Sequence, residues 1–157
     1  MSKFRGALLP IVPLATFMVT SALGETDSPE QRLEKAKRLD CTFSAVATAT
    51  WDEGIPSAAE TPATLEASFF DIDIAGGTAE AGGRFGASFI AVRYAHGYLH
   101  LIQTYDAGPL YVTTIFARET APGRFAAVHV RHEYTQTRLP GFTSRPELYA
   151  GDCAIAD

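Results

Sequence analysis

An alternation of apolar and polar residues with a period of two, which starts at Cys41, limits most strongly what this chain can fold into. In the segment CTFSAVATATW, residues 41–51, apolar and small side chains alternate with Thr and Ser, as expected for a strand with one buried face. The remaining strands are predicted at Leu65–Ile74, Thr78–Glu80, Ala87–Tyr94, Tyr98–Tyr105, Leu110–Arg118 and Arg124–Tyr134, and near Leu148. The adjacent Phe69 and Phe70 predict a β-bulge.

Short connections rich in turn residues separate these strands. They lie at Ala95–Gly97, Asp106–Pro109 and Glu119–Gly123. Evenly spaced short strands with tight turns favour an all-β fold, an antiparallel meander that closes as a small β-barrel, with a sandwich as the alternative.

The first 24 residues have the layout of a secretory signal peptide. Lys3 and Arg5 precede the apolar run ALLPIVPLATFMV, and small residues end the segment before Glu25. Pro10 and Pro13 interrupt the run, which disfavours a membrane-spanning helix. We therefore expect an exported bacterial protein, periplasmic or secreted, whose mature form has no membrane span.

The sequence predicts a helical segment at residues 25–40 and a barrel domain at residues 41–157. Ser28 is placed as the N-cap, Pro29 follows it at the first helical position, and Gln31 completes a capping box. The helix is expected to continue to about Leu39. Its apolar stripe is narrow, so it can cover a sheet or close an opening but cannot form a core.

Two cysteines, Cys41 and Cys153, stand near the two ends of the predicted barrel. An even number of cysteines in an exported chain favours a disulfide. A reactive thiol is disfavoured, because the chain has no C-x-x-C motif and Asp152 would raise the pKa of its neighbour.

The charge of the chain argues against two classes of partner. The formal net charge is −5, and removal of residues 1–24 takes away Lys3 and Arg5 and changes it to −7. The one dense basic group is Arg32, Lys35, Lys37 and Arg38. An acidic chain without a basic stripe disfavours binding to nucleic acid or to anionic membranes.

The three turns predict a strand register, and the register predicts an inner face. They pair Val92 with Leu99, Leu101 with Thr114 and Leu110 with His132. The predicted inner face comprises Ile90, Val92, Leu99, Leu101, Leu110, Val112, Phe116, Val128 and Val130. The predicted outer face comprises Tyr98, His100, Ile102, Tyr111, Ile115, Phe125, His129, Arg131 and Glu133.

A small polar group on this inner face is the candidate ligand-binding site. It consists of Gln103, Tyr105 and His132, with Tyr94 toward the opposite end. An apolar cavity with a few convergent polar groups is typical of a ligand site. A core histidine bonded to a tyrosine hydroxyl would explain the same residues.

No metal or cofactor is predicted. His129 and His132 are three residues apart, which places them on opposite faces of a strand. The segment after Asp71 and Asp73 lacks the later ligands of a calcium loop. The glycine-rich segment AGGRFG is not a dinucleotide-binding fingerprint, because no β-α unit surrounds it. The sequence contains no G-x-S-x-G nucleophile elbow.

Three functions follow as hypotheses. The first is an exported barrel that binds a small, partly apolar molecule without catalysis. The second is a barrel isomerase or cyclase with His132 as general acid–base and Tyr105 orienting it, so the question of catalysis stays open. The third is an envelope interaction module, or a homo-oligomer, that uses the outer aromatic face around Tyr98, Tyr111, Ile115 and Phe125.

The segments LYVTTIF, PGRFAAVHVRHEY and LPGFTSRPELYAGDC resemble those of small exported bacterial proteins of unassigned activity. In architecture, the predicted meander resembles lipocalin-like, avidin-like and allene-oxide-cyclase-like barrels. The resemblance implies a β-barrel architecture and brings no catalytic residues with it, because fold does not fix function.

Overall fold

The computed structural model describes residues 27–82, 88–105, 108–134 and 145–156. The predicted signal peptide lies outside these residues. The elements are α1 (Pro29–Lys35), β1 (Leu39–Asp52), β2 (Ile55–Asp73), β3 (Thr78–Gly82), β4 (Ser88–Ala95), β5 (Tyr98–Thr104), β6 (Leu110–Ala121), β7 (Arg124–His132) and β8 (Glu147–Ile155).

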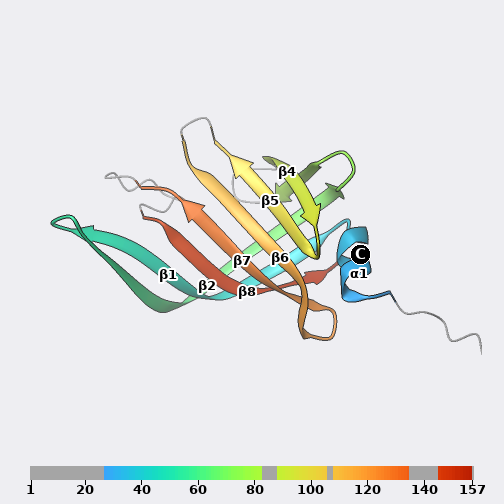
Figure 1. Cartoon of the computed structure of the whole chain (residues 1–157), viewed down its shortest axis with the longest axis horizontal. Coiled ribbons are helices and arrows are strands. Elements are labelled where there is room, and N and C mark those ends of the chain that lie inside the picture. Colours follow the sequence, from blue (N-terminus) through green and yellow to red (C-terminus); the bar gives the residue numbers. More distant parts are fainter. Residues whose placement is uncertain (1–26, 83–87, 106–107, 135–144, 157) are drawn as a thin grey trace, which may run out of the picture.

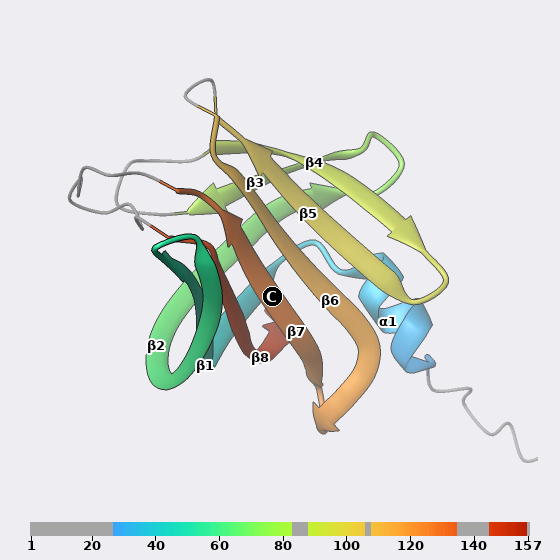
Figure 2. The same ribbon diagram turned by 60° about the vertical axis from the view of Figure 1, so that its left-hand side comes forward.

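The strands form one closed antiparallel sheet (Figures 1 and 2). Each strand pairs with the next in sequence, and β8 pairs back with β1. The predicted all-β fold, a meander that closes as a barrel with one short N-terminal helix, is confirmed.

The hairpin of β1 and β2 is longer than predicted and extends away from the other strands (Figure 1). Its turn is formed by Glu53 and Gly54, both in the left-handed region with φ of 48° and 83°, as a tight hairpin turn requires. All residues from 51 to 60 are exposed. This part of β2 escaped prediction because residues 56–64 are small, polar or proline and show no apolar alternation.

The predicted bulge in β2 is confirmed, slightly beyond the two phenylalanines. The β2–β3 register shifts between Phe70 and Asp73, and Asp71 has a φ of +51°. Phe69 and Ile72 are consequently both buried although they are three residues apart, because the extra residue of the bulge shifts the alternation of inward and outward side chains by one position.

A disulfide joins the first and last strands of the ring. Cys41 and Cys153 are direct partners in the β1–β8 pairing and are bonded to each other, as predicted. Next to them, a Cβ at Gly151 would overlap the backbone of Thr42 and Phe43. Glycine at this position therefore allows β8 to lie close to β1 where the β1 register shifts.

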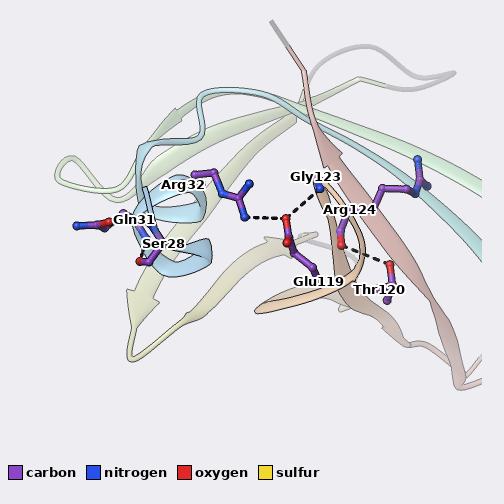
Figure 3. Close-up of polar contacts among 7 residues, drawn as sticks. All are labelled: Ser28, Gln31, Arg32, Glu119, Thr120, Gly123 and Arg124. Carbon is purple, nitrogen blue, oxygen red and sulfur yellow. Dashed lines mark hydrogen bonds and ion pairs between the residues drawn. The ribbon is translucent and has the colours of Figure 1, made fainter. Parts of the chain in front are cut away.

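The N-terminal helix begins as predicted and ends earlier. The Ser28 hydroxyl accepts from the Gln31 amide at 3.2 Å, and the Gln31 side chain accepts from the Ser28 amide at 2.8 Å (Figure 3). The helix ends at Lys35, and not near Leu39, because Leu39 is the first residue of β1 and pairs with Phe69 of β2 and Ile155 of β8. The carbonyls of Lys37 and Arg38 also accept from the amides of Ile72 and Ala156.

Helix α1 lies at the end of the barrel where the β4–β5 and β6–β7 turns are located (Figure 2). Leu33 is fully buried and belongs to the core. Arg32 Nη2 donates to Glu119 Oε1 at 2.7 Å, and the same oxygen accepts from the Gly123 amide at 2.9 Å (Figure 3). The helix is therefore anchored by apolar packing and by a polar contact to the β6–β7 turn.

The β4–β5 register differs from the prediction by two residues, which leaves the faces unchanged. The turn is formed by His96 and Gly97, with φ of 51° and 77°, so Val92 pairs with Leu101 and not with Leu99. Because side chains alternate with a period of two, the predicted inner positions of these strands are correct.

The β5–β6 register differs by one residue, which reverses the faces of every later strand in the prediction. Leu101 pairs with Thr113 and not with Thr114. The Tyr105 amide donates to the Pro109 carbonyl at 3.1 Å, so Pro109 belongs to the ladder although the sequence analysis assigned it to the loop. Gly108, with a φ of +106°, completes the shorter connection.

The faces of β6 and β7 are therefore the reverse of the prediction. Ile115 and Phe125, expected outside, have no exposed surface, and His129 is buried. His132, expected inside, is exposed. Leu110, Val112, Phe116, Val128 and Val130 lie on the outer side. The β6–β7 register itself was correct over Leu110–His132 and Val112–Val130.

This reversal removes most of the predicted outer aromatic face. Of its four named residues, Tyr98 is exposed, whereas Ile115 and Phe125 are core residues. Tyr111 pairs with the inward Arg131 and shares its face. An interaction surface built on these four side chains is thus not present.

The disulfide is expected to contribute strongly to stability, because it closes a chain segment with a sequence separation of 112 residues. Replacing Cys41 and Cys153 by alanine should lower the free energy of unfolding by roughly 4–5 kcal/mol in the chain-entropy model. Urea denaturation of the oxidised wild type and the double variant measures this. Equal midpoints would contradict it.

If α1 closes its end of the barrel through Leu33, truncation of this side chain should be costly. Leu33→Ala is expected to lower the free energy of unfolding by roughly 2–5 kcal/mol. The matched control is Leu148→Ala, since Leu148 is 43% exposed and should cost less than about 1 kcal/mol. Similar losses in both variants, measured by urea denaturation, would show that the helix does not anchor the core.

Candidate functional site

Two layers of polar side chains cross the inner face of β6, β7 and β8. Thr113, His129 and Tyr149 are direct partners across the three strands and form the deeper layer. Tyr111, Arg131 and Glu147 are direct partners one step nearer the end opposite α1. Glu133, just after β7, lies beyond them and is 6% exposed. We call these seven residues the interior polar cluster.

Strand alternation places the β7 members of this cluster on one face, and the β5–β6 register turns that face inward. In FAAVHVRHEY the inward positions are Phe125, Ala127, His129, Arg131 and Glu133. The strand therefore changes from apolar at the α1 end to polar at the other end. Its outward residues are smaller or exposed.

His129 is buried among aromatic rings and is held at both nitrogens. Its ring centroid lies 5.8 Å from that of Phe43 and 6.0 Å from those of Tyr111 and Tyr149. Arg131 Nε donates to His129 Nε2 at 3.2 Å, and an arginine nitrogen can only donate. The proton of the neutral ring is therefore on Nδ1, which donates to Thr113 Oγ1 at 2.8 Å.

The environment keeps His129 neutral. Burial first, and then the charge of Arg131, lowers the pKa of His129 to about 4. Desolvation disfavours the charged imidazolium, and a neighbouring cation disfavours it further.

Arg131 lies between two tyrosine rings. Its guanidinium carbon is 5.5 Å from the ring centroid of Tyr111 and 5.1 Å from that of Tyr149, distances at which a cation is attracted to an aromatic face. Its Nη1 is 3.8 Å from Glu147 Oε2. The guanidinium is thus fixed by stacking, by His129 and by one carboxylate.

Both tyrosines donate to carboxylates. The Tyr111 hydroxyl donates to Glu133 Oε2 at 2.8 Å, and the Tyr149 hydroxyl donates to Glu147 Oε2 at 2.7 Å. Burial, followed by the bond to Glu147, raises the pKa of Tyr149 to about 12. Burial and the bond to Glu133 likewise raise the pKa of Tyr111. Both hydroxyls therefore remain protonated donors at neutral pH.

The structure brings together two of the four predicted site residues. Gln103 Nε2 donates to the Tyr105 hydroxyl at 3.4 Å, and the Tyr105 ring centroid lies 5.1 Å from that of Tyr111. Gln103 and Tyr105 therefore border the interior polar cluster. Tyr94 is at the other end, where its hydroxyl donates to the Glu30 carbonyl of α1 at 3.1 Å. His132 is on the outside of β7.

The sequence analysis missed the cluster because of the one-residue error at β5–β6. His129, Arg131 and Glu133 were recognised as one set on one face, but that face was assigned to solvent. The outward position of His132 also removes the residue on which the acid–base hypothesis depended. Pro109 was the residue that could have signalled the shorter loop. A proline carbonyl can accept a hydrogen bond from the neighbouring strand although its nitrogen cannot donate one.

Other kinds of site lack the necessary groups in the described part of the chain. Among these residues, no three His, Cys, Asp or Glu side chains are grouped as a metal site requires. No helix of the described segments is long and apolar enough to cross a membrane.

A cleft of about 510 Å³ at the α1 end is lined by Arg32, Lys35 and Lys37, among others. Arg32 is paired with Glu119, and Lys35 with Asp27. The interior polar cluster is therefore the stronger candidate site.

Comparison with models of protein families, with curated proteins and with solved structures finds no match to this chain. Fold and site define it as a small, disulfide-closed antiparallel β-barrel with a polar interior at one end. The resemblance to lipocalin-like and related barrels stays a prediction.

The low pKa of His129 predicts a specific loss of stability in acid. The pKa is 6.5 in the unfolded chain and about 4 in the folded one, so between these values the unfolded state binds more protons and stability falls as pH decreases. Between pH 7 and 4.5 the contribution lost is about 2 kcal/mol.

The test compares wild type with His129→Gln, because an amide retains one donor and one acceptor but does not titrate. Urea denaturation at pH 7 and pH 4.5 should show a larger loss in the wild type by about 2 kcal/mol. Equal losses in both proteins would show that His129 is not the group responsible.

Proposed function

We propose that this protein is exported and binds a small, partly apolar molecule at the interior polar cluster, without catalysing a reaction. The observation that carries the proposal is the pair of polar layers on the inner face of an otherwise apolar barrel. Ligand sites typically combine apolar and aromatic walls with a few fixed polar groups.

The two ends of the barrel differ in a way that supports binding at one of them. The α1 end is filled by core residues, among them Leu33, Phe125 and Leu39. Toward the other end, the side chains of Arg131 and Glu147 are 20% and 17% exposed, whereas Glu133, which lies beyond them, is 6% exposed. Arg131 and Glu147 thus keep some contact with solvent, which supports entry of a molecule from this end.

The energetic cost of the cluster also favours function over packing. Charged groups that are removed from water are expensive, and apolar side chains of similar volume are often no less stable. A set of charges kept inside a small barrel is therefore more typical of a site than of a core. The same reasoning identifies perturbed pKa values in a recess as candidates for function.

The state of His129 supports binding without turnover. Both ring nitrogens are engaged, one by Thr113 and one by Arg131. With a pKa of about 4, this histidine is far from the neutral range in which general acid–base catalysis by histidine is efficient.

Export is supported by the disulfide and by the predicted signal peptide. Cys41–Cys153 is the kind of bond that forms in oxidising compartments such as the periplasm or the exterior.

Binding should be detected by native mass spectrometry and located by NMR. Protein purified from an oxidising compartment and mixed with a library of small apolar and amphiphilic molecules is expected to form one-to-one complexes. Amide shifts should concentrate on β6, β7 and β8 around Thr113, Arg131 and Tyr149. Shifts restricted to the outer surface, or no complex at all, would contradict the proposal.

A pair of matched variants tests the site. Tyr149→Phe removes the hydroxyl that donates to Glu147 and orients this carboxylate, and it should weaken binding by roughly tenfold, the worth of about one hydrogen bond. Tyr98→Phe makes the same change on the outer face, where Tyr98 is 48% exposed, and should leave affinity unchanged. Equal effects on affinity would place the ligand elsewhere.

A further inference from the structure

We infer that the interior polar cluster selects an organic cation, a protonated amine attached to an apolar body, with Glu133 as its counterion. This inference rests on the proposed function and adds the chemical class of the ligand.

The charges of the cluster do not balance. His129 is neutral, Arg131 carries one positive charge, and Glu133 and Glu147 are both carboxylates. Arg131 approaches Glu147 at 3.8 Å. Among the described residues, no ion pair includes Glu133. None of these ion pairs therefore supplies a cation to the carboxylate of Glu133.

Glu133 is also the carboxylate that is removed from water. It is 6% exposed, and among the described residues it accepts a hydrogen bond from the neutral hydroxyl of Tyr111 at 2.8 Å. A hydrogen bond from a neutral donor offsets part of the desolvation cost of a carboxylate, and a cation offsets much more of it. A ligand that supplies a positive charge at Glu133 would therefore gain most from this site.

Aromatic rings adjoin the carboxylate. The Tyr111 ring, whose hydroxyl contacts Glu133, lies 5.1 Å from the Tyr105 ring. Ammonium groups are attracted to tyrosine faces, most strongly where water is excluded. The position of Arg131 between Tyr111 and Tyr149 demonstrates that these walls accommodate a cation.

An anionic ligand fits this arrangement poorly. Arg131, the cation of the cluster, is covered on two sides by tyrosine rings, donates through Nε to His129, and faces Glu147 through Nη1. An anion that approached it would also meet Glu133 and Glu147. A neutral ligand would avoid this repulsion but would add no positive charge at Glu133.

Three probes of similar size and different charge test the inference: 2-phenylethylamine, 2-phenylethanol and 3-phenylpropanoate, titrated into the full chain at pH 7 by calorimetry with NMR mapping. The amine is expected to bind at β6–β8 at least tenfold more tightly than the alcohol, and the carboxylate more weakly than both.

Glu133→Gln supplies the matched variant, because the amide oxygen can still accept from Tyr111 while the charge is lost. Its affinity for the amine should fall at least tenfold, to that of the alcohol, and its affinity for the alcohol should not change. Glu60→Gln, on the exposed part of β2, makes the same change away from the site and should leave all three affinities unchanged.

The outcomes separate the two proposals. Tighter interior binding of the alcohol or the carboxylate, or an amine affinity that Glu133→Gln leaves unchanged, overturns the cation inference and leaves the binding function standing. If library molecules bind inside the barrel but none of the three probes does, the cation inference is likewise overturned. If no small molecule binds inside, the proposed function itself fails.

Discussion

The pairing of β1 with β2 on one edge and with β8 on the other is the constraint on which the rest of the structure depends. It closes the sheet, and a closed sheet has an inside and an outside that every strand must share. The disulfide between Cys41 and Cys153 lies on this seam, at two directly paired residues. Helix α1 then covers one end, and the polar layers occupy the interior toward the other.

The interior polar cluster is stable because its members satisfy one another. Thr113 and Arg131 orient His129, the rings of Tyr111 and Tyr149 stack on Arg131, and both hydroxyls donate to carboxylates. Buried polar networks are rigid when complete. The carboxylate of Glu133 belongs to none of the ion pairs found among the described residues, and a group of this kind is where a ligand can contribute binding energy.

Much of the local structure was predictable from the sequence. The capping box at Ser28 and Gln31, the bulge after Phe70 and the positions of most strands follow from short-range chemistry, which acts in the same way in any fold. The exposed half of β2 was not predictable, because residues 55–64 form a strand through pairing with β1 alone. The early end of α1 was not predictable either, since the long-range pairing of Leu39 with β2 and β8 causes it.

The candidate site shows most clearly what the sequence determines and what the tertiary structure determines. The sequence by itself determined that His129, Arg131 and Glu133 share a face, because side chains alternate along a strand. It also determined which two cysteines can be bonded. The tertiary structure alone decided that this face is the inner one. Both faces of β6 and β7 carry apolar residues, Val112, Val128 and Val130 on one and Ile115, Phe125 and Ala127 on the other. Hydrophobicity therefore does not distinguish the inner face from the outer one. The pairing of β6 with β5 decides it, and this pairing includes the bond from the Tyr105 amide to the Pro109 carbonyl.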